Sequence, residues 1–374
     1  MTEEQEQKHG GEWRARALID RGALRDNLEV ARRRAPNSRV MAVVKADAYG
    51  HGLAEVTETL APHVDAFAVA TLEEALACRD AHPRIMITVL SGLLAPESLE
   101  ICARHDLQPL AHSSAHLEWL AGYDGAPLSV WLKIDTGMTR LGLEPARVAG
   151  ALGELRRNSR IRVSGLMSHL ANADDAEDDF TASQLERYRK CADQHELARS
   201  LANSAGIMQW PQTHLDWVRP GILLYGGSPL RGRDAGELGL RAAMQLEARL
   251  ISVRDIEAGR ALGYGGAYRA RAAARIGMLA FGYADGYPRQ LSDRAAALVG
   301  GARAPVVGRV SMDMLALDLS DCPPEAAVVG GAAVLWGEEL RVDEIAEHAG
   351  TVAHELLCGV GARVPRIFVE RING

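Results

Sequence analysis

An alternation of short apolar runs with helical stretches repeats eight times between about residues 18 and 235, and it constrains the fold more than any other feature. The runs lie at 38–46, 66–70, 84–91, 107–111, 128–135, 162–170, 200–205 and 217–221. Strand-then-helix units of this length join parallel strands through crossover helices. Eight units predict an α/β fold with an eightfold β/α (TIM-like) barrel, although the pattern alone also allows a doubly wound sheet. Thr181 and Gln184 predict a capping box at one helix start.

The pattern changes after about residue 243, where strand-like segments alternate with glycine-rich turns such as GYGGAY and GYADGYP. Helical periodicity returns only at 343–357. These segments predict a mostly β C-terminal domain. We expect an N-terminal tail and strand at 1–17 that associates with the C-terminal domain, a barrel at 18–240 and a β-rich domain at 241–374, with a boundary near the polar stretch RGRDAGELG.

Charge and cysteine usage narrow the classes of partner and compartment. The formal net charge is −7 and the pI is about 6.0, so a nucleic-acid partner is not expected. The polar start MTEEQEQKHGGEW does not look like a signal peptide, and no apolar run reaches the roughly 20 residues that cross a bilayer. Five scattered cysteines show neither metal-binding spacing nor a disulfide framework. We expect a cytoplasmic protein that binds small molecules, with no metal and no membrane partner.

Polar residues stand at the expected carboxyl ends of the strands, where the loops of a β/α barrel build its active site. In chain order they are Lys45, Tyr49, Lys133, Asp135, Arg140, His169, Asn203, Ser204, Arg219, Gly221 and Ile222. Taken alone, each has a plain alternative, such as a solvated lysine, a core histidine or a loop ion pair. Their joint occurrence at matched positions favours a functional site.

Lys133 lies in a run whose side chains alternate between two faces. Trp131, Lys133 and Asp135 share one face, and the apolar residues between them suit the covering helices. Lys133 is therefore predicted to point into the barrel, where an unpaired ammonium is costly. The simpler alternative is an interaction between Lys133 and Asp135.

The segment DWVRPGILLYG predicts an anion site. A strand ending at Arg219 would aim the backbone N–H groups of Gly221 and Ile222 into the barrel mouth, where a phosphate would fit. The Ser204 hydroxyl, one strand away, would add a donor. A phosphate site beside a lysine in an apolar pocket raises the question of a pyridoxal 5′-phosphate Schiff base.

With these segments in place, the sequence resembles the alanine racemases of the pyridoxal-phosphate barrel type. The matching motifs are VVKADAYGHG, WLKIDTGMTRLG, GLMSHLANAD, LANSAGIMQWPQTHLDWVRPGILLYG, GYGGAY, GYADGYPR, VVGRVSMDMLALDL and RVPRIF. They extend from residue 43 to 368 and cover both predicted domains. The resemblance implies interconversion of L- and D-alanine, supplying D-alanine for cell-wall peptidoglycan or serving alanine catabolism. It also implies a homodimer with shared active sites.

The resemblance assigns catalytic roles to residues at matching positions. Lys45 matches the lysine that binds pyridoxal 5′-phosphate covalently as a Schiff base and acts on the D enantiomer. Tyr264 matches the second base, which acts on the L enantiomer from across the dimer. His169, Arg219 and Asp313 match residues that support catalysis, the first two behind the pyridine ring and the catalytic tyrosine.

The resemblance also implies binding roles. Arg140 and the backbone of Met312 match contacts to the substrate carboxylate. Lys133 matches a lysine that is often carbamylated and then pairs with Arg140. The other matches hold the cofactor, and they are Tyr49, Asn203, Ser204, Arg219, Gly221 and Ile222.

Two departures from the family pattern bear on specificity. Ala362 stands where some members have a tyrosine, and Ser200 stands where some have a histidine. A smaller residue near the pocket would admit larger side chains, so a broader-specificity or serine-type amino-acid racemase is an alternative. A decarboxylase of this architecture would need an acidic residue where Arg219 stands. A non-catalytic pyridoxal-phosphate carrier would need only the barrel.

Overall fold

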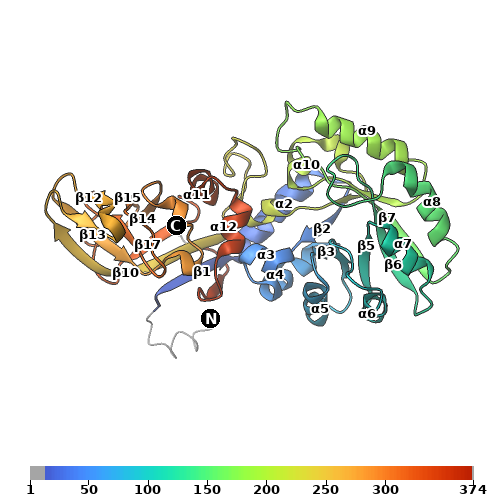
Figure 1. The fold of residues 1–374 in the computed structure, drawn as a ribbon, viewed down its shortest axis with the longest axis horizontal. Helices are drawn as coiled ribbons and strands as arrows, with labels where there is room; N and C mark the ends of the chain where they lie inside the picture. Colours follow the sequence, from blue (N-terminus) through green and yellow to red (C-terminus); the bar gives the residue numbers. More distant parts are fainter. Residues whose placement is uncertain (1–12, 373–374) are drawn as a thin grey trace.

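Eight parallel strands close into a barrel in the computed structural model, which describes residues 13–372 (Figure 1). Each strand pairs with the next along the chain, and pairing of Arg39 with Trp217 closes the ring. The strands are β2 (Arg39–Val43), β3 (Ala66–Val69), β4 (Met86–Val89), β5 (Leu107–Ala111), β6 (Leu128–Lys133), β7 (Ile161–Met167), β8 (Ala198–Ser200) and β9 (Trp217–Val218). The predicted β/α barrel is confirmed, and the doubly wound alternative is excluded.

Helices alternate with the strands and cover the outside of the barrel (Figure 1). They are α2 (Arg21–Arg34), α4 (Leu53–Leu60), α5 (Leu72–Ala81), α6 (Ser98–Arg104), α7 (Ser114–Ala121), α8 (Pro145–Leu155), α9 (Phe180–Ala192) and α10 (Ser204–Gln209). Parallel strands covered in this way are buried on both faces, which explains why the sequence AFAV of β3 is wholly apolar and wholly buried. Among residues 13–372, no helix is long and apolar enough to cross a membrane.

The capping box predicted at Thr181 and Gln184 is wrong. α9 begins at Phe180, so Thr181 lies inside the helix, and the backbone N–H of Phe180 donates a hydrogen bond to Asp178 Oδ1 at 2.7 Å. Gln184 reaches out of the helix instead: its Oε1 accepts a hydrogen bond from Ala171 N at 2.8 Å, and its amide donates to His169 O at 3.0 Å. A tertiary contact has replaced the local one, and Gln184 fixes the loop that follows β7.

The C-terminal domain is built on an eight-stranded sheet in the order β13-β16-β15-β14-β17-β10-β1-β18. Its strands are β1 (Ala15–Asp20), β10 (Met244–Ile256), β13 (Ala274–Leu279), β14 (Ala296–Val299), β15 (Ala302–Val307), β16 (Leu315–Asp318), β17 (Ala332–Trp336) and β18 (Arg366–Val369). A small hairpin of β11 (Ala261–Leu262) and β12 (Tyr268–Arg269) extends from it. The predicted helical stretch is split into α11 (Val342–Ala349) and α12 (Ala353–Gly359), because Gly350 turns left-handed at φ 70°. The mostly β character is confirmed.

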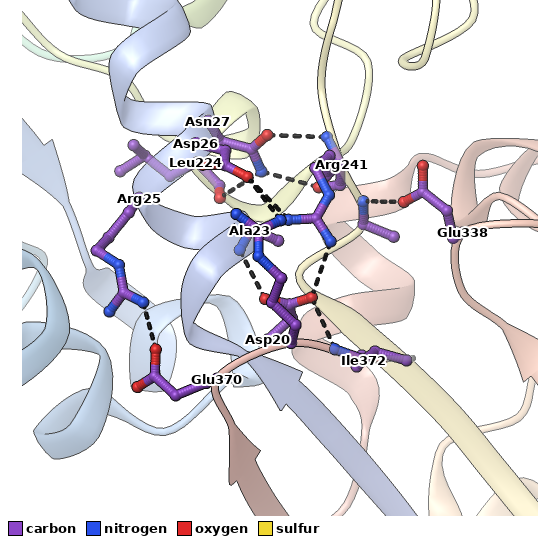
Figure 2. Close-up of polar contacts among 12 residues, drawn as sticks. Asp20, Ala23, Arg25, Asp26, Asn27, Leu224, Arg241, Glu338, Glu370 and Ile372 are labelled. Atoms are coloured by element: carbon purple, nitrogen blue, oxygen red, sulfur yellow. Dashed lines mark hydrogen bonds and ion pairs between the residues drawn. The ribbon is translucent and has the colours of Figure 1, made fainter. Parts of the chain in front are cut away.

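The chain passes between the two bodies at Asp20, the last residue of β1 and the cap of α2. Its buried carboxylate accepts hydrogen bonds from Ala23 N at 2.7 Å and Ile372 N at 3.0 Å and pairs with Arg241 at 3.1 Å. Asn27 holds the same arginine through its backbone, accepting from Arg241 N at 2.9 Å and donating to Arg241 O at 2.8 Å. Figure 2 shows three distant segments converging on this cluster. β1 lies in the C-terminal sheet, between β10 and β18. The domain boundaries at residues 17 and 240 stay predictions. Residues 1–12 of the predicted N-terminal tail lie outside the described part of the chain.

Candidate active site

A large open cavity of about 1560 Å³ lies at the carboxyl ends of the barrel strands. The predicted site residues that line it are Lys45, Tyr49, Lys133, Arg140, His169, Asn203, Ser204, Arg219, Gly221 and Ile222. They come from the ends of β2, β6, β7, β8 and β9, because the carboxyl ends of parallel barrel strands share one rim. The structure thus gathers the barrel half of the predicted site.

Lys45 opens a short left-handed turn, α3 (Lys45–Gly50). The four residues 46–49 all have positive φ angles of 52° to 54°. This conformation costs about 1–2 kcal/mol for each residue with a Cβ, or roughly 4–8 kcal/mol over the turn. Backbone strain of this kind is found at functional sites.

The surroundings of Lys45 are an open, charged cavity and not the apolar pocket expected from its sequence neighbours. Its side chain is exposed to the cavity. Desolvation by the surrounding protein atoms lowers the pKa of the amine, and the positive charge of Arg140 lowers it further. Both effects favour the neutral amine, which is the form that attacks a carbonyl carbon.

Lys133 is buried at the end of β6 and lines the cavity. Burial lowers the pKa of Lys133 to about 8, and the charge of Arg219 adds to this effect. The Asp135 carboxylate is engaged elsewhere, since it accepts hydrogen bonds from Gly137 N at 2.8 Å and Thr139 N at 3.1 Å. It therefore shapes the turn after β6, and the ion pair considered between Lys133 and Asp135 is not formed.

Arg219 is 4% exposed, and its hydrogen-bond partners within residues 13–372 are all uncharged. Its Nη1 donates to Ser200 Oγ at 2.5 Å, and its Nη2 donates to Ser168 O at 2.6 Å and lies 3.3 Å from His169 Nδ1. Burial lowers the pKa of Arg219 to about 10, which leaves it protonated at neutral pH. Burial, and then the charge of Arg219, lower the pKa of His169 well below its ordinary range, so the imidazole is neutral.

Tyr49, Ser204 and Gly221 meet at one edge of the cavity. The Tyr49 ring stacks on Tyr225 with centroids 4.5 Å apart. Ser204 Oγ accepts a hydrogen bond from Gly221 N at 2.8 Å. A Cβ on Gly221 would lie 2.5 Å from Tyr49 Oη, so only glycine lets the phenol approach this backbone. A phenol, a hydroxyl and backbone N–H groups in one concave edge fit a phosphate group.

Sequence reasoning left three neighbours of the site unassigned. Gln184 holds the loop of His169, and Ser200 binds Arg219. Glu74 Oε1 accepts a hydrogen bond from the backbone N–H next to Lys45 at 2.6 Å. Glu74 carried a correct local signal, because its spacing from Thr71 is that of the capping box that starts α5, whereas the same kind of signal at Gln184 was misleading.

Tyr264, Met312 and Asp313 lie outside the cavity. Tyr264 is 72% exposed in the turn between β11 and β12, and Figure 1 places β12 at the end of the C-terminal domain far from the barrel. Met312 is 53% exposed. The Asp313 carboxylate accepts a hydrogen bond from Arg363 at 2.7 Å. Within a single chain, these three residues therefore lie apart from the site residues of the barrel.

The chain has a β/α barrel followed by a β domain, with Lys45 on a turn and a concave edge that fits a phosphate at the barrel mouth. These features define the class of barrel-type enzymes that use pyridoxal 5′-phosphate on amino acids. The sequence models for the N-terminal and C-terminal domains of alanine racemase match residues 19–229 and 243–368. The chain belongs to the alanine racemase family. The resemblance drawn from the motifs is thereby confirmed.

Individual relatives agree along nearly the whole chain. An alanine racemase of Nitrosococcus oceani is 47% identical over 352 residues, which cover 94% of this chain and 98% of the relative. The crystal structure of a biosynthetic alanine racemase from Pseudomonas aeruginosa has a TM-score of 0.92 at 44% identity, covering 96% of this chain and 100% of that one. An alanine racemase structure from Bartonella henselae, described with covalently bound pyridoxal phosphate, has a TM-score of 0.88 at 29% identity and covers 96% of this chain and 100% of that one.

Proposed function

We propose that this protein interconverts L- and D-alanine by a two-base mechanism with pyridoxal 5′-phosphate as cofactor. The observation that carries the proposal is the placement of Lys45 at the mouth of a cavity that is also lined by the cationic side chains of Lys133, Arg140 and Arg219. These cations at the barrel mouth would attract an anionic cofactor and the carboxylate of an amino acid. Membership of the alanine racemase family and the cofactor described for the Bartonella henselae relative support the same reaction.

The residues at the barrel mouth fit the cofactor. Lys45 Nζ would hold its aldehyde carbon covalently, as the lowered pKa of the amine favours. Its phosphate would be held by the concave edge of Tyr49, Ser204, Gly221 and Ile222. Asn203 would act by placing Ser204, since its own side chain caps α10 through Gly206 N at 3.0 Å. When bound, the pyridoxal ring would draw electrons and so acidify the Cα–H of an attached amino acid.

Arg219 would donate a hydrogen bond to the ring nitrogen of the cofactor. Because it stays protonated at neutral pH, it would not give up its proton there. Its contact with neutral His169 extends toward the cavity surface. Because Nδ1 of neutral His169 faces the Arg219 donor, the imidazole proton would lie on Nε2 and donate a hydrogen bond to Tyr264 Oη of the partner subunit, which would stabilise the phenolate form of that base.

Arg140 and Lys133 would set the position of the substrate carboxylate. Arg140 is exposed in the cavity and would pair with that carboxylate. A pKa of about 8 leaves part of the Lys133 population neutral near pH 7 to 8. The neutral Nζ can form a bond to the carbon of carbon dioxide and lose a proton, which yields a carbamate anion that would hold Arg140.

Racemisation requires bases on the two faces of Cα. Lys45 Nζ would move the proton on one face, acting on D-alanine. Tyr264 Oη of the partner subunit would move it on the other face, acting on L-alanine. The backbone of Met312 of the partner subunit would add a contact to the substrate carboxylate, with Asp313 of the partner subunit supporting the same loop.

A homodimer with shared sites is proposed because the C-terminal domain exposes apolar groups. Tyr264 and Met312 are joined there by Tyr283 and Met314, which are 43% and 37% exposed. Tyr283 N donates a hydrogen bond to Ser311 O at 3.0 Å, so the two loops lie together. Exposed aromatic and methionine side chains in one region are typical of an interface.

The cellular role is also a proposal. Supply of D-alanine for peptidoglycan is favoured by the similarity to the biosynthetic alanine racemase of Pseudomonas aeruginosa, which is 46% identical over 353 residues. Alanine catabolism is the other role for the same reaction. The cytoplasm is the proposed compartment, because all five cysteines are free thiols.

The direct test is a panel of L-amino acids incubated with the purified protein and pyridoxal 5′-phosphate, with each D product measured by chiral chromatography. We expect fast conversion of L-alanine and slower conversion of larger amino acids such as serine. Faster conversion of a larger amino acid would indicate a broader-specificity racemase. Bound cofactor without any D product would indicate a carrier and refute the proposal.

A further inference from the structure

The second arginine of the motif RVPRIF, Arg366, contacts the turn that carries Lys45. Its Nε donates a hydrogen bond to the carbonyl oxygen of Gly50, the last residue of the turn, at 2.9 Å. Its other nitrogens donate to three more backbone oxygens, which are Val360 O at 2.6 Å, Gly361 O at 2.7 Å and Val364 O at 2.7 Å. Arg366 therefore ties the end of the left-handed turn to the loop that follows α12.

The helix α12 also packs against this turn, and Figure 1 shows α12 beside α3. Gly50 has a φ angle of 77°, and a Cβ at this position would overlap the carbonyl oxygen of Leu357. Leu357 is itself buried. The turn therefore cannot shift toward the C-terminal domain without moving α12.

Glu74 holds the other end of the turn from the barrel side. Its Oε1 accepts a hydrogen bond from Ala46 N, the residue after Lys45, at 2.6 Å. Its Oε2 accepts from Ala70 N at 2.8 Å and Thr71 N at 3.3 Å, just beyond the end of β3. The first and last residues that follow Lys45 in the turn are thus bound to two different domains.

We propose that Arg366 and Glu74 are positioning residues for Lys45. They hold a strained left-handed turn in the conformation that presents Nζ to the cavity, and without them residues 46–49 would relax toward right-handed conformations. Both act through backbone atoms of the turn. The inference rests on the proposed function only in taking Lys45 as the amine that binds the cofactor.

The chain offers a matched control for Arg366. Arg79 also donates to four backbone oxygens, which are His82 O at 2.9 Å, Ile85 O at 2.8 Å, His105 O at 2.8 Å and Asp106 O at 2.8 Å. These oxygens precede β4 and β5, at the end of the barrel opposite Lys45. Arg366→Met and Arg79→Met therefore remove the same number of bonds at opposite ends of the barrel.

Two measurements on the full-length protein test the proposal without relying on racemase activity. Amide hydrogen exchange of residues 45–52, measured by mass spectrometry without cofactor, should become about tenfold faster in Arg366→Met and stay at the wild-type rate in Arg79→Met. Trapping of pyridoxal 5′-phosphate on Lys45 with borohydride, located by peptide mass, should slow in Arg366→Met and keep the wild-type rate in Arg79→Met. Glu74→Gln should show the same direction of change in both readouts. With saturating cofactor, kcat for alanine should fall while KM changes little.

Unchanged exchange and trapping in Arg366→Met, or equal changes in the two arginine variants, would overturn the proposal. If Arg366→Met does not fold, Arg366→Lys decides, because it keeps one donor nitrogen in place of three and should give an intermediate exchange rate. Wild-type exchange in that variant would count against the proposal. A wild-type protein that traps the cofactor on Lys45 but does not racemise alanine would refute the proposed reaction and leave the exchange result to decide the positioning role.

Discussion

The barrel mouth includes buried charged residues among its candidate site residues, whereas those of the C-terminal domain are exposed. In the barrel, Lys133 is 8% exposed and Arg219 is 4% exposed, and burial shifts the pKa of each. In the C-terminal domain, Tyr264 is 72% exposed and Met312 is 53% exposed. The barrel half has its electrostatic character fixed within one chain. The other half would acquire its setting only when a second chain covers it.

The two halves differ because of how their backbones are held. Barrel residues follow buried parallel strands and are fixed by side chains such as Gln184 and Ser200. Tyr264 stands on a three-residue turn between strands of two residues each. Preorganised polar groups are effective where charge develops during a reaction, so we assign the electrostatic work to the barrel and proton transfer on one face to the C-terminal domain.

The largest effect is expected from Lys45→Ala, which removes the centre of the barrel half. Without the amine, the protein should lose covalent cofactor and at least ~1000-fold of its racemase activity. Absorbance of the bound cofactor and production of D-alanine measure the two losses. Lys190→Ala is the control, because Lys190 lies on the surface of α9 and pairs with Glu186 at 2.6 Å. Comparable activity in the two variants would remove Lys45 from its role.

The next effect tests the C-terminal half. Tyr264→Phe should lower the rate by about 10²–10⁴, since a proton-transfer group is lost. Exchange of the Cα proton with deuterated solvent, followed by NMR, should be lost mainly from L-alanine and persist from D-alanine through Lys45. Tyr123→Phe is the control, because the Tyr123 hydroxyl donates to the surface residue Glu100 at 3.3 Å. Equal retention of exchange from both enantiomers would contradict the assignment.

A smaller effect is expected on the unfolding free energy, which the buried charge of Lys133 at the barrel mouth should lower. Lys133 has a pKa of about 8 in the folded protein against an ordinary 10.5, so below pH 8 folding buries an ammonium and places it near the positive charges of Arg219 and Arg140. Lys133→Met should raise the unfolding free energy of the cofactor-free protein by about 2–3 kcal/mol at pH 7 in buffer free of carbon dioxide.

The difference in unfolding free energy between Lys133→Met and the wild type should depend on pH in a defined direction. Between pH 8 and 10.5 the unfolded chain binds more protons at Lys133 than the folded one, so wild-type stability rises with pH and the advantage of Lys133→Met should shrink. Urea denaturation at pH 7, 9 and 10.5 measures it. The same variant should lose activity if a Lys133 carbamate holds Arg140. A stability difference that does not depend on pH would contradict the electrostatic explanation.

The smallest effect concerns the phosphate edge. Gly221→Ala places a Cβ 2.5 Å from Tyr49 Oη, which should displace the phenol and weaken cofactor binding by about tenfold. Gly150→Ala is the control, because Gly150 lies in α8 with nothing within 4 Å of a new Cβ. It should stabilise the protein by about 0.5–1 kcal/mol and leave binding unchanged. Titration of the cofactor by absorbance compares the two variants, and equal affinities would argue against this phosphate edge.

Much of the barrel could be predicted because its signals are local. Short apolar runs mark the buried strands. Alternation in LSVWLKID places Lys133 on the same face as Trp131, whose ring packs against the Trp217 ring inside the barrel with centroids 6.3 Å apart. The ties that hold Lys45 could not be predicted. Glu74 and Ala46 are 28 residues apart, and Arg366 and Gly50 are 316 apart, so only the folded chain shows these contacts.

One wrong prediction and one helix break that was not predicted show where local patterns fail. The spacing of Thr181 and Gln184 matches a capping box, but Gln184 makes tertiary hydrogen bonds to the His169 loop instead. The helical pattern at 343–357 continues through Gly350, yet the left-handed conformation of that glycine separates α11 from α12. In both cases the pattern was compatible with two structures, and long-range packing or a backbone conformation decided between them.

The central claim is that Lys45 of one subunit works with Tyr264 of the other, and mixing of two inactive variants tests it. In a dimer of Lys45→Ala with Tyr264→Phe, shared sites would pair intact Lys45 of one chain with intact Tyr264 of the other and leave one site complete. Random pairing should then restore about one quarter of wild-type activity in the refolded or co-expressed mixture. No activity above that of the separate variants, in a mixture shown to contain heterodimers, would contradict the claim.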